Sequence, residues 1–106
     1  MEIQEQTNTY NRDLRSVRNK LTSLQRDARV NAVTTHQIES LDPSVPLYRS
    51  VGKAFVLTGR SDIEGRLESE IAELTKNERD LADRQEYLER RIASNNNNLK
   101  DLTSGL

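Results

Sequence analysis

The sequence contains no cysteine and no tryptophan among its 106 residues. Without cysteine there is no disulfide framework and no thiolate metal site. Aromatic residues make up only 4% of the chain and hydrophobic residues 33%. A compact domain of this length normally carries more apolar side-chain mass. The composition therefore argues against a wide globular core and favours an elongated helical protein with a thin apolar seam.

Long hydrophobic runs are also missing. No apolar stretch approaches the roughly 20 residues that a membrane-spanning helix needs, so we expect no membrane partner. The first residues contain no basic segment followed by an apolar one, so we expect no secretory signal and a cytoplasmic location. The net charge is only −1, which argues against a nucleic-acid partner bound through phosphate neutralisation.

A heptad pattern occupies residues 1–30, which contain neither proline nor glycine. Steps of four and three residues alternate between its apolar members, which is the spacing of a coiled-coil seam. The seam positions are Ile3, Thr7, Tyr10, Leu14, Val17, Leu21, Leu24 and Ala28. This stretch predicts the first arm of a coiled coil.

A separate short helix is expected after this arm. The heptad pattern weakens at Asn31, and the two threonines that follow suggest a break with a new helix N-cap at Thr35. We predict this helix over residues 35–42. Pro43 and Pro46 then end it, because proline cannot continue a helix.

A second heptad pattern follows Gly59 and predicts a second coiled-coil arm over residues 61–102. Ser61 and Glu64 have the spacing of a capping box, which places the helix N-terminus at Ser61. The apolar seam residues are Leu67, Ile71, Leu74, Leu81, Leu88, Ile92, Leu99 and Leu102. Three polar residues interrupt this seam, namely Glu78, Gln85 and Asn95. The asparagine run over residues 95–98 has poor helix propensity, so we expect a weakened or fraying helix end there.

The apolar segment between the arms, residues 47–58, predicts a β-hairpin. Gly52-Lys53 separates two strand-like runs, and glycine at the first central position suits a type II′ turn. In this register one face presents Leu47, Val51, Ala54 and Val56, and the other presents Tyr48, Phe55 and Leu57.

Both faces of this hairpin are largely apolar, whereas a half-exposed hairpin alternates apolar and polar residues. A two-stranded hairpin is marginal in water, and exposed apolar faces with unpaired edges invite association. We therefore expect equivalent hairpins of other chains to complete it, as a small barrel or a layered sheet. The alternative is a hairpin that folds onto its own helices.

The residues that carry catalysis in other proteins are sparse here. His36 is the single histidine, so a metal site would lack further ligands and a proton-transfer role would lack a pocket. The carboxylates of the second arm fit solvated helix faces with i,i+4 partners, as in Glu86 and Arg90. No G-x-x-x-x-G-K-[ST] phosphate loop is present. We predict no enzymatic activity and no cofactor.

The hairpin motif resembles that of the β-class subunits of the prefoldin family. It consists of residues 48–53 (YRSVGK) and 55–57 (FVL), set between two coiled-coil arms. The stretch from Thr35 through Ile38 into the second arm has the same layout. The resemblance implies a single prefoldin-like domain over residues 1–106. Its fold is mostly α, an antiparallel helical coiled-coil hairpin with one small β-hairpin at the bend.

The resemblance also implies a function. Prefoldin is a hexameric, ATP-independent co-chaperone whose subunits pool their hairpins into a double β-barrel platform. The tips of its coiled coils bind non-native proteins such as actin and tubulin, which are delivered to the cytosolic chaperonin. The implied assembly residues are Leu47, Tyr48, Val51, Gly52, Phe55, Val56 and Leu57. The implied client-binding tip residues are Ile3, Tyr10, Leu99, Leu102 and Leu106.

Two alternatives stay open at this point. The tip residues are explained equally well as members of the coiled-coil seam. The whole chain is also compatible with a structural coiled-coil adaptor that tethers parts of a larger scaffold. A nucleic-acid-associated helical protein fits less well, because residues 61–106 carry seven basic against eleven acidic side chains.

Overall fold

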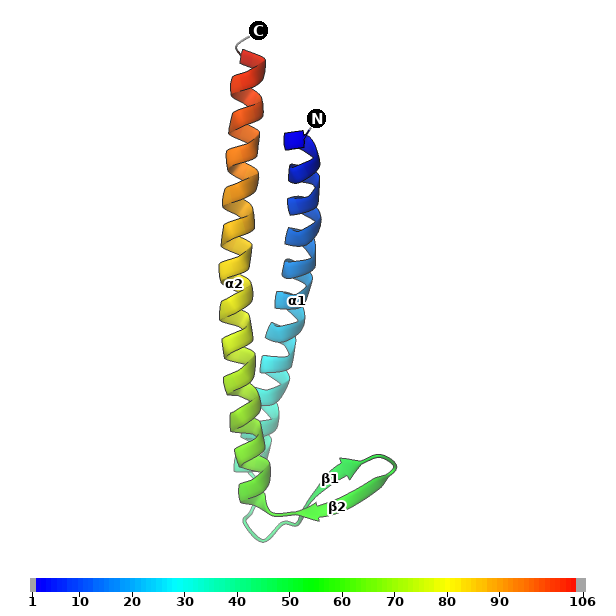
Figure 1. Cartoon of the computed structure of the whole chain (residues 1–106). Helices are drawn as coiled ribbons and strands as arrows, with labels where there is room; N and C mark the ends of the chain where they lie inside the picture. The colour runs from blue at the N-terminus through cyan, green and yellow to red at the C-terminus, as the bar shows by residue number, and fades with distance from the viewer. Residues whose placement is uncertain (1, 105–106) are drawn as a thin grey trace. The chain divides into compact units, whose positions relative to one another are not determined.

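The computed structural model describes residues 2–104. Over this range the chain forms helix α1 (Glu2–Glu39), strands β1 (Leu47–Val51) and β2 (Ala54–Thr58), and helix α2 (Arg60–Ser104). Figure 1 shows the two strands as a hairpin that connects the two long helices. The predicted architecture, two long helices with one small antiparallel hairpin between them, is confirmed.

The described chain divides into two compact units. The first combines α1 up to Gln25 with α2 from Asn77 onward, and the second spans Arg26–Lys76 and contains the hairpin. Long helices are held mainly by packing of one apolar face rather than by helix propensity. Each unit therefore needs a seam of its own.

The seam of the first unit consists of the predicted heptad positions of both helices. Its buried core comprises Leu14, Val17 and Leu21 of α1 and Leu88 of α2. Three half-buried residues pack against this core, namely Tyr10, Leu81 and Ile92. Thr7 is also buried, and its hydroxyl donates a hydrogen bond to the carbonyl oxygen of Ile3 at 2.9 Å. The heptad pattern thus predicted the face of each helix that packs.

The seam of the second unit continues the heptad register with polar residues. Asn31 is only 5% exposed, and its Nδ2 donates to the carbonyl oxygen of Leu67 in α2 at 3.1 Å. Thr35 Oγ1 donates to the side-chain oxygen of Asn31 at 3.4 Å. Ile38 is buried at the next seam position. Hydrogen bonds therefore replace some of the apolar contacts across this part of the seam.

The predicted break after Asn31 and the separate helix over 35–42 are wrong. Helix α1 continues without interruption to Glu39, because the polar seam residues find partners inside the helical structure. The chain leaves the helix at Ser40, whose backbone N–H and hydroxyl donate to the carbonyl oxygen of His36 at 3.1 and 2.8 Å.

The predicted capping box at Ser61 is also wrong, because α2 begins one residue earlier. The carbonyl oxygen of Gly59 accepts hydrogen bonds from the backbone N–H groups of Asp62 at 3.1 Å and Ile63 at 3.2 Å. Gly59 is therefore the N-cap, a position that glycine tolerates well. The Glu64 carboxylate is engaged by Arg60 Nε at 3.1 Å instead of by the helix N-terminus.

The asparagine run over residues 95–98 is helical, and α2 continues to Ser104. Asn95 lies in the seam and is only 4% exposed, whereas the next three asparagines are exposed. The run is therefore helical in the structure, and the expected weakening of this end of α2 stays a prediction.

Candidate assembly surface

Strands β1 and β2 form the predicted β-hairpin, in which a two-residue turn joins the strands. Their Cα partners run from Val51 with Ala54 at the turn to Leu47 with Thr58 at the base. Gly52 has a φ of 61°, whereas Lys53 does not have a positive φ. This combination is that of a type II′ turn, whose twist matches the twist of the paired strands.

The strand register sorts the hairpin side chains onto two faces, and both faces are exposed. Tyr48, Phe55 and Leu57 share one face and are 59%, 75% and 65% exposed. Val51 and Val56 share the other face and are each 46% exposed. Within the second unit the hairpin extends to one side of the helices (Figure 1). These side chains are therefore left largely uncovered by the rest of residues 2–104.

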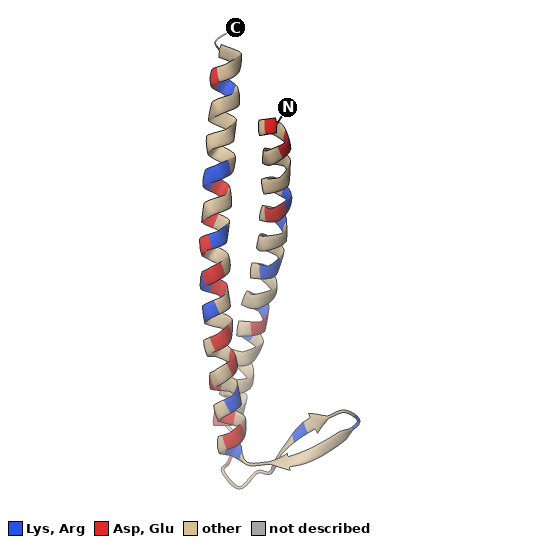
Figure 2. Cartoon of the chain, viewed as in Figure 1, with Lys and Arg blue, Asp and Glu red and all other residues tan. Residues whose placement is uncertain are grey.

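Of the seven predicted assembly residues, only Leu47 is half-buried, and the other six are exposed. The alternative of a hairpin folded onto its own helices is not what the single chain adopts. Arg49 and Lys53 are the only charged residues of segment 47–58, and Figure 2 shows no acidic residue on the hairpin. Arg49 Nε is buried yet has no hydrogen-bond partner among residues 2–104. The hairpin thus presents a largely apolar surface whose only charged side chains are the basic Arg49 and Lys53.

Arg60 fixes the base of the hairpin, a role that the sequence did not reveal. Its guanidinium donates hydrogen bonds to the carbonyl oxygens of Leu41, at 3.0 Å, and Ile38. Its Nε also pairs with the Glu64 carboxylate at 3.1 Å. Carbonyls at a helix C-terminus lack intrahelical donors and favour a nearby cation. Arg60 therefore connects the end of α1 to the start of α2, directly after β2.

A tight turn leads from α1 toward the hairpin. The N–H of Val45 donates to the carbonyl oxygen of Asp42 at 3.0 Å, with Pro43 at the second turn position, where its fixed φ is favourable. The Asp42 carboxylate accepts from the backbone N–H of Ser44 at 2.9 Å and from its hydroxyl at 2.7 Å. Both hydrogen bonds lower the pKa of Asp42, and the one from the backbone N–H of Ser44 has the larger effect. The loop entering β1 is therefore held by its own polar groups.

The predicted client-binding residues lie in the first unit and differ in exposure. Ile3, Tyr10 and Leu99 are half-buried at seam positions, whereas Leu102 is 55% exposed. Tyr10 packs against the buried core, and the Arg91 guanidinium carbon lies 5.9 Å from the centroid of its ring. Leu106 lies outside the described residues. Leu102 is therefore the one predicted tip residue that is exposed within the described part of the chain.

Clusters of metal-binding side chains are absent from the described part of the chain. Residues 2–104 contain no group of three or more His, Cys, Asp or Glu side chains that could hold a metal ion. His36 lies alone in the last turn of α1. Neither α1 nor α2 is long and apolar enough to cross a membrane.

Sequence comparisons relate this chain to known proteins. The family model for the prefoldin subunit matches residues 1–105. Prefoldin subunit 1 of Arabidopsis thaliana is 28% identical over 102 residues, which cover 96% of this chain and 80% of that protein. Probable prefoldin subunit 1 of Dictyostelium discoideum is 22% identical over 101 residues, or 95% of this chain and 88% of that protein. Both relatives are named as subunits of prefoldin, the family that the hairpin motif resembles.

A solved structure shares the fold. The crystal structure of the prefoldin beta subunit from Thermococcus strain KS-1 matches with a TM-score of 0.88 and 19% sequence identity. The match covers 95% of this chain and 89% of that one. The helix–hairpin–helix arrangement is therefore that of a known subunit fold.

Proposed function

Because the chain belongs to the prefoldin subunit family, we propose that it acts as one subunit of a hetero-hexameric, ATP-independent co-chaperone of the cytoplasm. Its hairpin joins the hairpins of other prefoldin subunits in a β-barrel platform. The assembled complex binds non-native proteins, such as actin and tubulin, and delivers them to the cytosolic chaperonin. The chain itself catalyses no reaction and takes no cofactor.

The exposed hairpin supports this proposal most directly. Tyr48, Phe55 and Leu57 present one apolar face to solvent, and the opposite face presents Val51 and Val56. Burial of a large apolar side chain contributes roughly 1.5–3 kcal/mol, and an isolated two-stranded hairpin is only marginally stable. Partner hairpins that cover both faces would supply the stabilisation that the single chain lacks.

Client binding is assigned to the helix ends of the first unit. Leu102 is already exposed, and we assign it the main contact with non-native proteins. Fraying at the N-terminal end of α1 and at the C-terminal end of α2 makes the half-buried Ile3, Tyr10 and Leu99 accessible as well, and Leu106 is assigned the same role. Each contact is weak, but several subunits acting on one client raise the effective concentration of binding sites.

The double variant Phe55→Asp/Val56→Asp tests the assembly role. Each substitution places a carboxylate on one apolar hairpin face, where burial by a partner would leave the charge unpaired. Co-expressed with tagged partner subunits, this variant is expected to be lost from the purified complex.

The matched control is Val30→Asp/Val33→Asp, which changes two exposed valines of α1 outside the hairpin, 60% and 57% exposed. It is expected to co-purify with the partner subunits as the unchanged chain does. Retention of the hairpin variant at the level of this control would contradict the proposal.

A further inference from the structure

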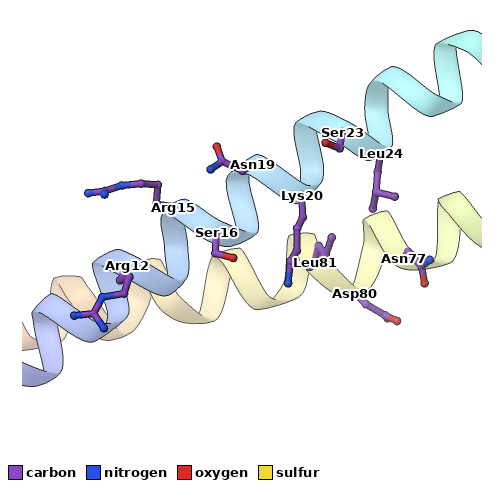
Figure 3. A pocket seen from close by; sticks show the side chains of 10 residues that line it. All are labelled: Arg12, Arg15, Ser16, Asn19, Lys20, Ser23, Leu24, Asn77, Asp80 and Leu81. Atoms are coloured by element: carbon purple, nitrogen blue, oxygen red, sulfur yellow. The ribbon is translucent and has the colours of Figure 1, made fainter.

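A groove of about 770 Å³ lies within the first unit. Helix α1 lines it along residues 12–24 and helix α2 along residues 77–81. Figure 3 shows Leu24 and Leu81 in the space between the two helices, with Lys20 reaching toward α2. Both leucines are only half-buried, so the seam leaves apolar surface accessible at this point.

The polar lining of the groove is predominantly basic. Arg12, Arg15 and Lys20 all line it, and Asp80 is the single acidic lining residue. Some other cations of this unit are paired, as in Arg18 with Glu89 at 3.3 Å and Arg84 with Asp13 at 4.0 Å. Within residues 2–104, none of the three lining cations has a carboxylate oxygen within 4.0 Å.

The remaining lining residues leave the groove unobstructed. Ser16, Asn19 and Ser23 of α1 are small or short side chains, and Asn77 completes the lining from α2. Long basic side chains can lay their aliphatic stems along apolar surface while their charged ends stay in water. The result is an apolar floor with small polar walls and cations at the rim.

We propose that this groove binds an amphipathic helical segment of a partner protein, whose apolar stripe is flanked by aspartate and glutamate. Leu24 and Leu81 receive the apolar stripe, and the three unpaired cations receive the flanking carboxylates. Residues 12–24 span roughly 18 Å of helix, about the length of three turns of such a segment. A third helix packed between two others also suits the ridges and grooves that helices present.

A helical protein segment fits this surface better than nucleic acid does. No aromatic side chain lines the groove, whereas single-stranded nucleic acid is usually held by base stacking on aromatic platforms. The apolar floor, in contrast, has no counterpart on a phosphate chain.

The test uses the chain assembled with its partner subunits and two synthetic helical peptides. Both peptides carry the same leucine stripe, which glutamate and aspartate flank in one and lysine in the other. The acidic peptide is expected to bind at least about tenfold more tightly than the basic one, with an affinity that falls as salt is added. Equal affinity of the two peptides would overturn the proposal.

Variants then locate the binding. Arg15→Glu/Lys20→Glu is expected to weaken binding of the acidic peptide by at least about tenfold. The matched control, Arg29→Glu/Arg79→Glu, makes the same charge change at two exposed residues of the same helices that do not line the groove. It is expected to leave the affinity within about twofold. Equal weakening by both double variants would indicate general electrostatic attraction and overturn the proposal.

A third variant blocks the groove without changing its charge. Ser16→Trp places a bulky side chain in the groove, and we expect it to weaken binding of the acidic peptide by about tenfold. This variant keeps the test decisive if the charge reversal disturbs assembly. Undiminished binding to it, or tighter binding of a single-stranded oligonucleotide than of the acidic peptide, would contradict the proposal.

Discussion

At the junction of β2 and α2, Arg60 does two things at once. It donates hydrogen bonds to the carbonyl oxygens of Ile38 and Leu41, and it pairs with Glu64. Its side chain is 28% exposed, so these contacts are partly shielded from water. The base of the hairpin therefore depends on one side chain that follows the strand directly.

Removal of this side chain is expected to loosen the end of α1. In Arg60→Ala two carbonyls lose a charged donor, which costs about 1–3 kcal/mol for partly buried groups. Amide hydrogen exchange over residues 36–45 of the assembled chain should accelerate accordingly. Arg66→Ala, which removes an exposed arginine of α2 with no ion pair within residues 2–104, is the control and should leave these amides unchanged. Unaltered exchange in Arg60→Ala would contradict the anchoring role.

Substitution of glycine by alanine is expected to change stability in opposite directions at Gly52 and Gly65. Gly52 has a φ of 61°, where a side chain is strained, so Gly52→Ala should destabilise the hairpin by about 1 kcal/mol. Gly65 lies within α2 and a Cβ added there meets nothing within 4 Å, so Gly65→Ala should stabilise the helix by about 0.5–1 kcal/mol. Thermal unfolding of the assembled chain measures both. Shifts of the same sign in the two variants would contradict the turn geometry.

Helices α1 and α2 each place an asparagine in the seam, and the two asparagines differ in whether the side-chain amide has a hydrogen-bond partner. Asn31 is buried and hydrogen-bonded across the seam to the carbonyl oxygen of Leu67. Asn95 is also buried, but its Nδ2 has no hydrogen-bond partner among residues 2–104. A buried unpaired amide costs free energy that an apolar side chain of similar size does not. The seam of the first unit is therefore not at its most stable composition.

Replacement of this amide is expected to stabilise the first unit. Asn95→Leu removes the unpaired group and adds apolar contact, which should raise the free energy of unfolding by about 1–3 kcal/mol. Asn96→Leu makes the same chemical change at an exposed neighbour and corrects for the shared gain in helix propensity. Urea unfolding of the two variants provides the comparison. If Asn95→Leu raises the free energy of unfolding no more than Asn96→Leu does, the predicted cost of the buried unpaired amide is contradicted.

The sequence predicted those elements that local patterns determine. The apolar heptads identified the packed faces around Leu14 and Leu88, and Gly52-Lys53 identified the turn and strand register. Asn31 was misread as the end of a helix, because a pattern of apolar residues cannot show that an amide finds a partner on the opposite helix. The capping box failed for a similar reason, since Arg60 engages Glu64.

The candidate site was predictable only in part. The apolar residues of the hairpin could be named because their alternation follows from the strand register, and the structure shows six of the seven exposed. The anchoring role of Arg60 depends on contacts with carbonyls 19 and 22 residues away in the sequence, which no local motif encodes. The basic groove likewise combines α1 with a distant stretch of α2.

For the whole molecule, the proposed activities fall in different units. The hairpin lies in the second unit, whereas Leu102 and the basic groove lie in the first. Assembly and partner binding should therefore be separable by mutation. Phe55→Asp/Val56→Asp acts on assembly, and Arg15→Glu/Lys20→Glu acts on the groove while the hairpin stays intact.

The central claim is that other prefoldin subunits cover the exposed hairpin of this chain. Native mass spectrometry of the gently purified, tagged chain from its own cells tests this most directly. We expect a single assembly in which five different small coiled-coil subunits accompany this chain, one copy each, as the family resemblance implies. A homodimer, or a complex with one large unrelated partner, would contradict the claim and favour a scaffold adaptor.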